Sequence, residues 1–184
     1  MHIVVAPDSF KGTASAPEAA AAIAMGVRQA LPEATVTTLP MADGGEGTAA
    51  VLAQAAAAGG QSVETITLPT TDAIGRLTQA SYALAGTTAF IDVASATGLP
   101  AVQDSLDPLH ADSYGTGVLI ADAQTRGARR IVLCLGGSAT IDGGTGILVA
   151  LGANPIDQAG YQLTPGGGAL EHLASFDTAK VNVP

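Results

Sequence analysis

The sequence predicts an α/β fold in which a parallel-sheet part comes first and a second, mixed α/β part follows. In the first 60 residues a strand, a glycine-rich turn and a helix follow one another twice, which is the pattern of parallel strands joined by helical crossovers. From about residue 62, apolar and polar residues alternate, as they do in half-exposed strands. Hydrophobic residues make up 47% of the chain and charged residues only 12%, which excludes a disordered protein.

The first strand and helix have clear local signals. Residues 2–6 form a short apolar run with β-branched residues, typical of a buried strand. Ser15 is followed three positions later by Glu18, which is a capping-box pattern for the start of a helix. We expect this helix to run to about Leu31, because Pro32 cannot continue it.

The second strand and helix repeat this arrangement. Residues 34–39 predict a strand, and a turn over residues 43–47 then opens a helix that continues to about Ala58. The pair Gly59-Gly60 ends that helix, since glycine readily takes the backbone conformation found just beyond a helix.

The second part of the chain contains shorter and more varied elements. We place a domain boundary near residues 70–76, so that residues 1–72 form the N-terminal part and residues 73–184 a second α/β domain. Gly86-Thr87 predicts a hairpin between two of its strands. The expected elements are strands at 63–68, 79–84, 88–94 and 129–135, helices at 113–126 and from the third glycine turn to Gly152, and a short helix at 169–173.

Charge and cysteine content exclude several functional classes. The net charge of −9 disfavours nucleic acid and anionic membrane surfaces as partners, because both attract basic proteins. The single Cys134 rules out an intrachain disulfide and fits a reducing compartment. No signal peptide and no apolar run long enough to span a bilayer is present, so we expect a soluble, cytoplasmic protein. The three histidines are scattered, which argues against a structural zinc site.

Three turns that combine glycine with aspartate are the candidate functional site. Ligands of open α/β sheets sit beyond the carboxyl ends of the strands, where these turns are expected. In the first turn, Lys11 suits an anionic oxygen, Asp8 suits a hydroxyl group or a metal, and Ser9 is a further candidate for binding the substrate. The alternative is that Asp8 caps the turn and that Lys11 is an ordinary solvated charge.

The second turn places two carboxylates beside glycine backbone, which no side chain covers. Asp43 and Glu46 flank Gly44 and Gly45, an arrangement that suits Mg²⁺, which takes one or two carboxylates and leaves its other positions to phosphate and water. The alternative is a helix start in which acidic residues complement the helix dipole. That alternative explains Glu46 better than it explains Asp43.

The third turn predicts a phosphate cradle built from backbone N–H groups and hydroxyls. It does not match the Walker pattern or the dinucleotide fingerprint, and tight packing of a strand on a helix is the alternative interpretation. Asp142 lies inside the turn, after a strong strand. The candidate phosphate-binding residues are Gly136, Gly137, Ser138, Thr140, Gly143 and Gly144.

These turns resemble those of the bacterial type I glycerate kinases. The resemblance extends over the whole chain, and its blocks are residues 6–13, 39–48, 94–99, 114–117, 136–146 and 166–170. It implies phosphorylation of D-glycerate that depends on ATP and Mg²⁺ and usually gives 2-phosphoglycerate. It also implies two α/β domains, one of them flavodoxin-like, with the active site in the cleft between them.

The resemblance further implies roles for three residues and a length for the chains of this family. Lys11 would neutralise the glycerate carboxylate or the transferring phosphoryl group, Asp43 would bind Mg²⁺ or accept the proton of the attacking hydroxyl, and Asp142 would be a second candidate base or metal ligand. Family chains are about twice this length, as two domains require. We therefore expect an N-terminal fragment in which either domain could be incomplete, and which could form homo-oligomers. The alternatives are a non-catalytic binding or assembly module derived from the kinase, and another α/β enzyme that acts on a sugar acid.

Overall fold

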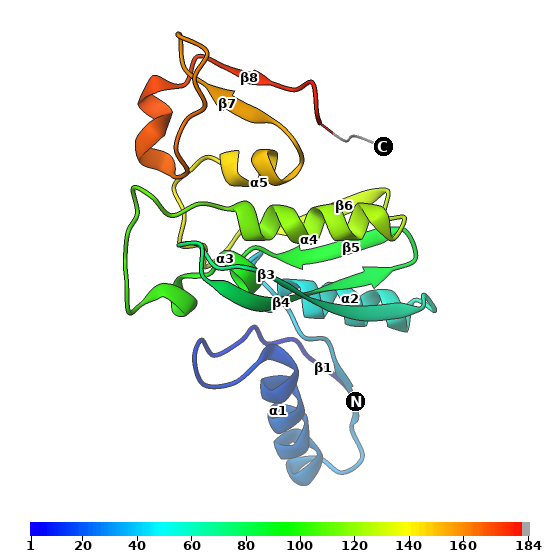
Figure 1. The fold of residues 1–184 in the computed structure, drawn as a ribbon. Helices are drawn as coiled ribbons and strands as arrows, with labels where there is room; N and C mark the ends of the chain where they lie inside the picture. Colours follow the sequence, from blue (N-terminus) through cyan, green and yellow to red (C-terminus); the bar gives the residue numbers. More distant parts are fainter. Residues whose placement is uncertain (182–184) are drawn as a thin grey trace.

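The computed structural model describes residues 1–181, and Figure 1 shows three tiers of structure stacked along the molecule. The N-terminal unit lies at one end, a four-stranded sheet with its helices lies in the middle, and a small unit near the C-terminus lies at the other end. The elements are β1 (His2–Val5), α1 (Ala16–Ala30), β2 (Thr35–Thr38), α2 (Thr48–Ala58), β3 (Val63–Thr71), β4 (Leu77–Ala85), β5 (Thr88–Asp92), α3 (Ala94–Thr97), η1 (Leu99–Val102), α4 (Tyr114–Thr125), β6 (Arg130–Cys134), α5 (Thr145–Ala150), β7 (Asn154–Ile156), η2 (Gly167–His172) and β8 (Ser175–Asp177).

The N-terminal unit consists of two parallel strands and one helix. β1 pairs with β2 in parallel, from His2 opposite Thr35 to Val5 opposite Thr38. The predicted capping box is confirmed, because the Ser15 side chain accepts a hydrogen bond from the Glu18 N–H while the Glu18 carboxylate accepts one from the Ser15 N–H. The buried face of α1 consists of alanines, so the helix packs close to the strands with little side-chain volume between them.

The central sheet has the strand order β3-β4-β5-β6, with antiparallel pairing except between β5 and β6, which are parallel. Helix α4 and helix α2 lie on opposite sides of this sheet (Figure 1). The main hydrophobic core forms here, around the fully buried side chains of Ile91 and Leu119 and the largely buried Ile66 and Tyr82. The fold is therefore mixed α/β, as the sequence predicts.

The sheet pairing bears on the division into domains. The β3–β4 ladder runs from Val63 opposite Ala85 to Thr71 opposite Leu77, so the expected boundary at residue 72 falls in the turn of one hairpin. Helix α2 also contacts β3, β4 and β5. We therefore propose that the first domain of this chain ends near residue 45, before α2. The division into two domains itself remains a prediction.

Several predicted elements differ from those observed: the strand expected at 63–68 continues to Thr71, and the strand expected at 79–84 begins at Leu77. The strand expected at 88–94 ends at Asp92, because the Val93 carbonyl accepts a bond from the Thr97 N–H and the chain turns into α3. The short helix expected at 169–173 is the 3₁₀ helix η2, which begins at Gly167. Within residues 1–181, no helix is both long enough and apolar enough to cross a bilayer.

Candidate active site

The first and second glycine turns meet at an ion pair between Lys11 and Asp43. The Lys11 Nζ lies 3.7 Å from the Asp43 Oδ2, and both side chains are exposed. A hydrogen bond of 2.9 Å from the Met41 N–H to the Pro7 carbonyl holds the two segments in register. Two predicted site residues that are distant in sequence therefore share one surface.

The Asp43 carboxylate is held in its ionised form. The Gly45 N–H donates to the Asp43 Oδ1 at 3.0 Å, and this bond, together with the nearby charge of Lys11, lowers the pKa of Asp43. Asp8, Ser9 and Glu46 lie in the same two turns; Asp8 and Glu46 are exposed, and the Asp8 Oδ1 accepts the Ser9 N–H at 2.6 Å.

Asp92, at the carboxyl end of β5, anchors the second turn to the central sheet. Its two carboxylate oxygens accept hydrogen bonds from the Gly47 and Ala49 N–H groups, both at 2.9 Å. These bonds satisfy N–H groups at the start of α2, which would otherwise lack an acceptor. They also hold the C-terminal end of the Asp43 turn against the central sheet. Sequence reasoning did not assign Asp92 a role; its only signal was an acidic residue at the end of a predicted strand.

The second and third turns touch through their backbones. A Cβ on Gly136 would overlap the Cα of Gly45, so only glycine permits this approach. The third turn is fixed on its other side by antiparallel pairing with residues 97–99, in which the Leu99 N–H donates to the Gly137 carbonyl and the Ala139 N–H to the Thr97 carbonyl, both at 2.9 Å. All three turns are thus linked in space.

Asp142 lies inside the protein and not on this surface. Its side chain is buried, and its Oδ2 accepts hydrogen bonds from the Ser113 N–H, the Ser113 hydroxyl and the Gly146 N–H. Its Oδ1 accepts the Gly144 N–H at 3.1 Å. This set of bonds joins the third turn to the starts of α4 and α5, which is the geometry of a structural anchor.

Sequence comparison identifies the family of the chain. A model of the glycerate kinase family matches residues 3–183. The chain belongs to the glycerate kinase family. It is 43% identical over 182 residues to a glycerate kinase of Bacillus subtilis, and 43% identical over 180 residues to a glycerate 2-kinase of Escherichia coli. These alignments cover 97% and 96% of this chain and 46% of each relative.

A solved structure supports the fold. The crystal structure of a protein described as a glycerate kinase 2 from Salmonella typhimurium LT2 matches with a TM-score of 0.81 and 42% identity, over 98% of this chain and 48% of that chain. The chain thus spans about half the length of the family members that it matches.

The residues of this glycerate kinase family chain fit a magnesium ion only in part. Within residues 1–181, no group of three or more His, Cys, Asp and Glu side chains is arranged to hold a metal. Asp43 nevertheless offers one exposed carboxylate with a lowered pKa, and its Oδ2 lies 3.7 Å from the exposed Lys11 Nζ. One protein carboxylate is enough for Mg²⁺ when phosphate and water complete its shell.

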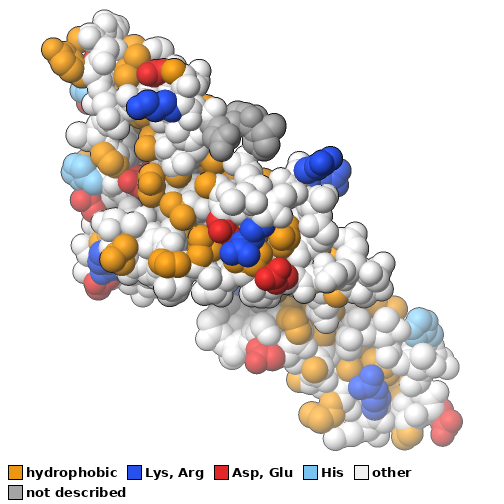
Figure 2. Space-filling model, turned by 45° about the vertical axis from the view of Figure 1, so that its right-hand side comes forward, with side chains coloured by type: hydrophobic (Ala, Val, Ile, Leu, Met, Phe, Trp, Pro, Cys, Tyr) orange, Lys and Arg blue, Asp and Glu red, His pale blue; other side chains and the backbone are white. Residues whose placement is uncertain are grey.

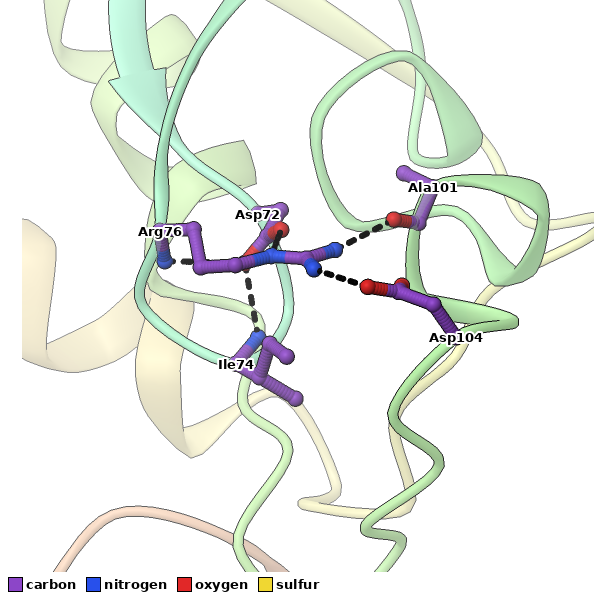
Figure 3. A network of polar contacts seen from close by, with 5 residues as sticks. All are labelled: Asp72, Ile74, Arg76, Ala101 and Asp104. Atoms are coloured by element: carbon purple, nitrogen blue, oxygen red, sulfur yellow. Dashed lines mark hydrogen bonds and ion pairs between the residues drawn. The ribbon is translucent and has the colours of Figure 1, made fainter.

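A network of polar contacts around Arg76 joins the β3–β4 turn to the segment around η1 (Figure 3). The Arg76 guanidinium donates to Asp72 at 2.6 Å, to Asp104 at 2.7 Å and to the Ala101 carbonyl at 2.5 Å. These contacts fasten the β3–β4 turn to η1, and η1 follows directly on the residues that pair with the third turn. Burial acts to raise the pKa of Asp72, but its hydrogen bonds with Arg76 outweigh burial and lower it.

The cations of this family member are spread out. On the face in Figure 2, Lys and Arg side chains stand apart from one another and form no continuous basic area. An anionic substrate would have to be held locally, by single cations such as Lys11 and by backbone N–H groups.

Proposed function

We propose that this chain forms part of a kinase that transfers phosphate from ATP to D-glycerate in the presence of Mg²⁺ and gives 2-phosphoglycerate. The observation that carries the proposal is the meeting of Lys11 and Asp43 beside the contact between Gly45 and Gly136. This arrangement joins one cation, one carboxylate and two stretches of accessible backbone, which phosphoryl transfer uses for positioning and charge neutralisation.

The pKa of Asp43 favours one of its two candidate roles. A general base works best when its pKa lies near the operating pH, whereas the pKa of Asp43 is lowered by Gly45 and Lys11. A carboxylate that stays ionised suits a metal ligand. Asp43 is therefore assigned as a ligand that would hold Mg²⁺, which would neutralise charge on the donor phosphates.

Lys11 and the first turn are assigned to the substrate. The Lys11 ammonium neutralises the glycerate carboxylate or the transferring phosphoryl group, and its exposed side chain, which lies 3.7 Å from Asp43, is accessible for this. Asp8, Ser9 and Glu46 supply hydrogen bonds to the glycerate hydroxyls. The Gly44 and Gly45 N–H groups already donate to the Thr48 Oγ1 and to the Asp43 Oδ1, which makes these two glycines weaker candidates.

The third turn is assigned to the donor phosphates. Gly136, Gly137, Ser138 and Thr140 lie nearest the contact with the second turn along the chain, and Gly143 offers a further flexible position. The Gly144 N–H already bonds to Asp142 at 3.1 Å, which makes Gly144 a weaker candidate. The buried, fully bonded Asp142 acts as a positioning residue for this turn and not as a base or metal ligand.

Transfer is tested in a chimera, because the chain spans about half of its relatives. In the chimera, residues 1–184 replace the matching half of the Bacillus subtilis glycerate kinase, to which they are 43% identical. We expect the chimera to release ADP only when D-glycerate and Mg²⁺ are present, and to form 2-phosphoglycerate, identified by ³¹P NMR. We also expect the enzyme to be cytoplasmic. A folded chimera that transfers no phosphate from ATP to D-glycerate would instead favour a non-catalytic module.

A further inference from the structure

A surface pocket of about 430 Å³ lies between the segment around His110 and residues 162–172. Neither Lys11 nor Asp43 lines it, nor does any other residue assigned to the site described above. Its volume falls in the range of about 300–1,000 Å³ that small-molecule sites occupy. It is too large for a three-carbon acid to fill.

The pocket and the third glycine turn share a wall. The run from Gly166 to Gly168 passes between the two, and the Gly168 N–H donates to the Leu109 carbonyl at 2.9 Å on the pocket side. On the other side, a Cβ on Gly167 would lie 2.6 Å from the Ile141 carbonyl oxygen, and the Leu170 side chain reaches Gly143. A ligand in the pocket would therefore lie beside the turn assigned to phosphate.

The chemistry of the lining favours a neutral, partly apolar ligand. Leu109, Leu163 and Ala169 provide apolar surface, while Gln162, Thr164 and His172 provide hydrogen-bonding groups. None of the lining residues is Lys or Arg, in the part of the chain that the structure describes.

Nearby carboxylates reinforce that preference. Asp107 contacts the His110 ring at 2.9 Å, and Glu171 contacts the His172 ring at 3.4 Å. Acidic groups at the edge of the pocket repel an anion but accept hydrogen bonds from hydroxyls, as carboxylates do from the ribose of bound nucleotides.

We propose that this pocket binds the nucleoside of the phosphate donor, with the base against the apolar side chains and the ribose near the carboxylates, so that the phosphates reach the third turn. This assignment rests on the proposed kinase function for its ligand. It goes beyond that function by giving the nucleoside of the donor a location on this chain, beside the third turn.

Binding measurements on the 184-residue chain test the assignment without phosphate transfer. Adenosine, ATP and inorganic triphosphate are titrated separately by calorimetry. We expect adenosine to bind and ATP to bind more tightly. Replacing Ala169→Phe fills the pocket and should weaken both adenosine and ATP at least tenfold, while inorganic triphosphate is unaffected.

Ala159→Phe is the matched control, because Ala159 is exposed and does not line the pocket; it should bind all three ligands as the native chain does. His172→Ala is a second variant that removes an exposed side chain, so it tests the pocket even if Ala169→Phe fails to fold. It should weaken adenosine several-fold.

The outcomes separate this proposal from the kinase function. If adenosine does not bind at millimolar concentration, or if both pocket variants bind it as the native chain does, the nucleoside assignment is overturned, even when the chimera phosphorylates D-glycerate. If adenosine binds as expected while the chimera transfers no phosphate, the kinase proposal fails and the pocket assignment stands.

Discussion

Gly45 and Gly136 belong to two different glycine-rich turns, yet their backbones touch so closely that a Cβ on Gly136 would overlap the Cα of Gly45. This contact joins the Asp43 turn, which follows β2, to the turn that follows β6. It brings together two stretches of backbone that the proposed reaction assigns to metal and phosphate.

The contact predicts a strong effect of a single methyl group. Gly136→Ala should lower the free energy of unfolding by about 2 kcal/mol, because the two backbones must separate to make room. The matched control is Gly26→Ala in α1, where an added Cβ has no neighbour within 4 Å. Alanine in a helix should stabilise the chain there by about 0.5–1 kcal/mol. Equal effects of the two substitutions, measured by urea unfolding, would contradict the account.

Asp142 should matter for stability. Asp142→Ala leaves the N–H groups of Ser113, Gly144 and Gly146 without their acceptor, which should cost about 3 kcal/mol of unfolding free energy. Asp177→Ala is the control, because Asp177 is exposed and its side chain accepts one bond, from the Ala179 N–H. A variant at position 142 as stable as the native chain would show that Asp142 is no anchor.

Acid should weaken the Arg76 network. The pKa of Asp72 is lower in the folded chain than its ordinary value of about 3.9 in an unfolded chain. Its ionised form therefore stabilises the fold above about pH 4, and this contribution is lost as the pH falls through the folded pKa. We expect Asp72→Ala to destabilise the chain by about 2 kcal/mol at pH 7 and by less below pH 4.

Asp157 provides a control with the same turn geometry. The Asp157 Oδ1 accepts hydrogen bonds from the N–H groups two and four residues later, as the Asp72 Oδ1 does. The residue four positions after Asp157 is Tyr161, whereas four positions after Asp72 it is an arginine. Asp157→Ala should therefore cost less stability than Asp72→Ala at pH 7. A larger cost at position 157 would mean that the turn, and not the arginine, accounts for the effect.

The exposed apolar side chains of the N-terminal unit predict self-association. Val4 on β1 and the neighbouring Leu39 and Met41 are each about half exposed, beside a sheet of only two strands. Light scattering should detect oligomers that increase with added salt, because salt screens the net charge of −9. Val4→Glu should reduce association, whereas Leu77→Glu, at the exposed first position of β4, should not. A monomer at every salt concentration would contradict this prediction.

Sequence reasoning predicted what local chemistry determines. The capping box of Ser15 and Glu18 acts within one helical turn, so the start of α1 was predictable. Glycine-rich turns are also local, and the meeting of Lys11 with Asp43 follows from parallel strands that end at the same edge.

Long-range pairing was not predictable in the same way. The strands β3 and β4 pair across residue 72 as one hairpin. The register of this antiparallel ladder is not specified by the alternation of apolar and polar residues alone. The burial of Asp142 depends on Ser113, 29 positions earlier, and the role of Asp92 depends on N–H groups 43 and 45 positions earlier. An aspartate in a glycine-rich turn looks the same in sequence whether it faces solvent or the interior.

The most direct test of the central claim is the rate of phosphate transfer to D-glycerate by the folded chimera, with Asp43 and with Asp43→Asn. Removing a metal ligand should lower kcat at least about a hundredfold. The melting temperature should change little, because the Asp43 side chain is more than half exposed. If the folded Asp43→Asn protein transfers phosphate at a near-normal rate, the site formed by Lys11, Asp43 and the glycine turns is not the active site.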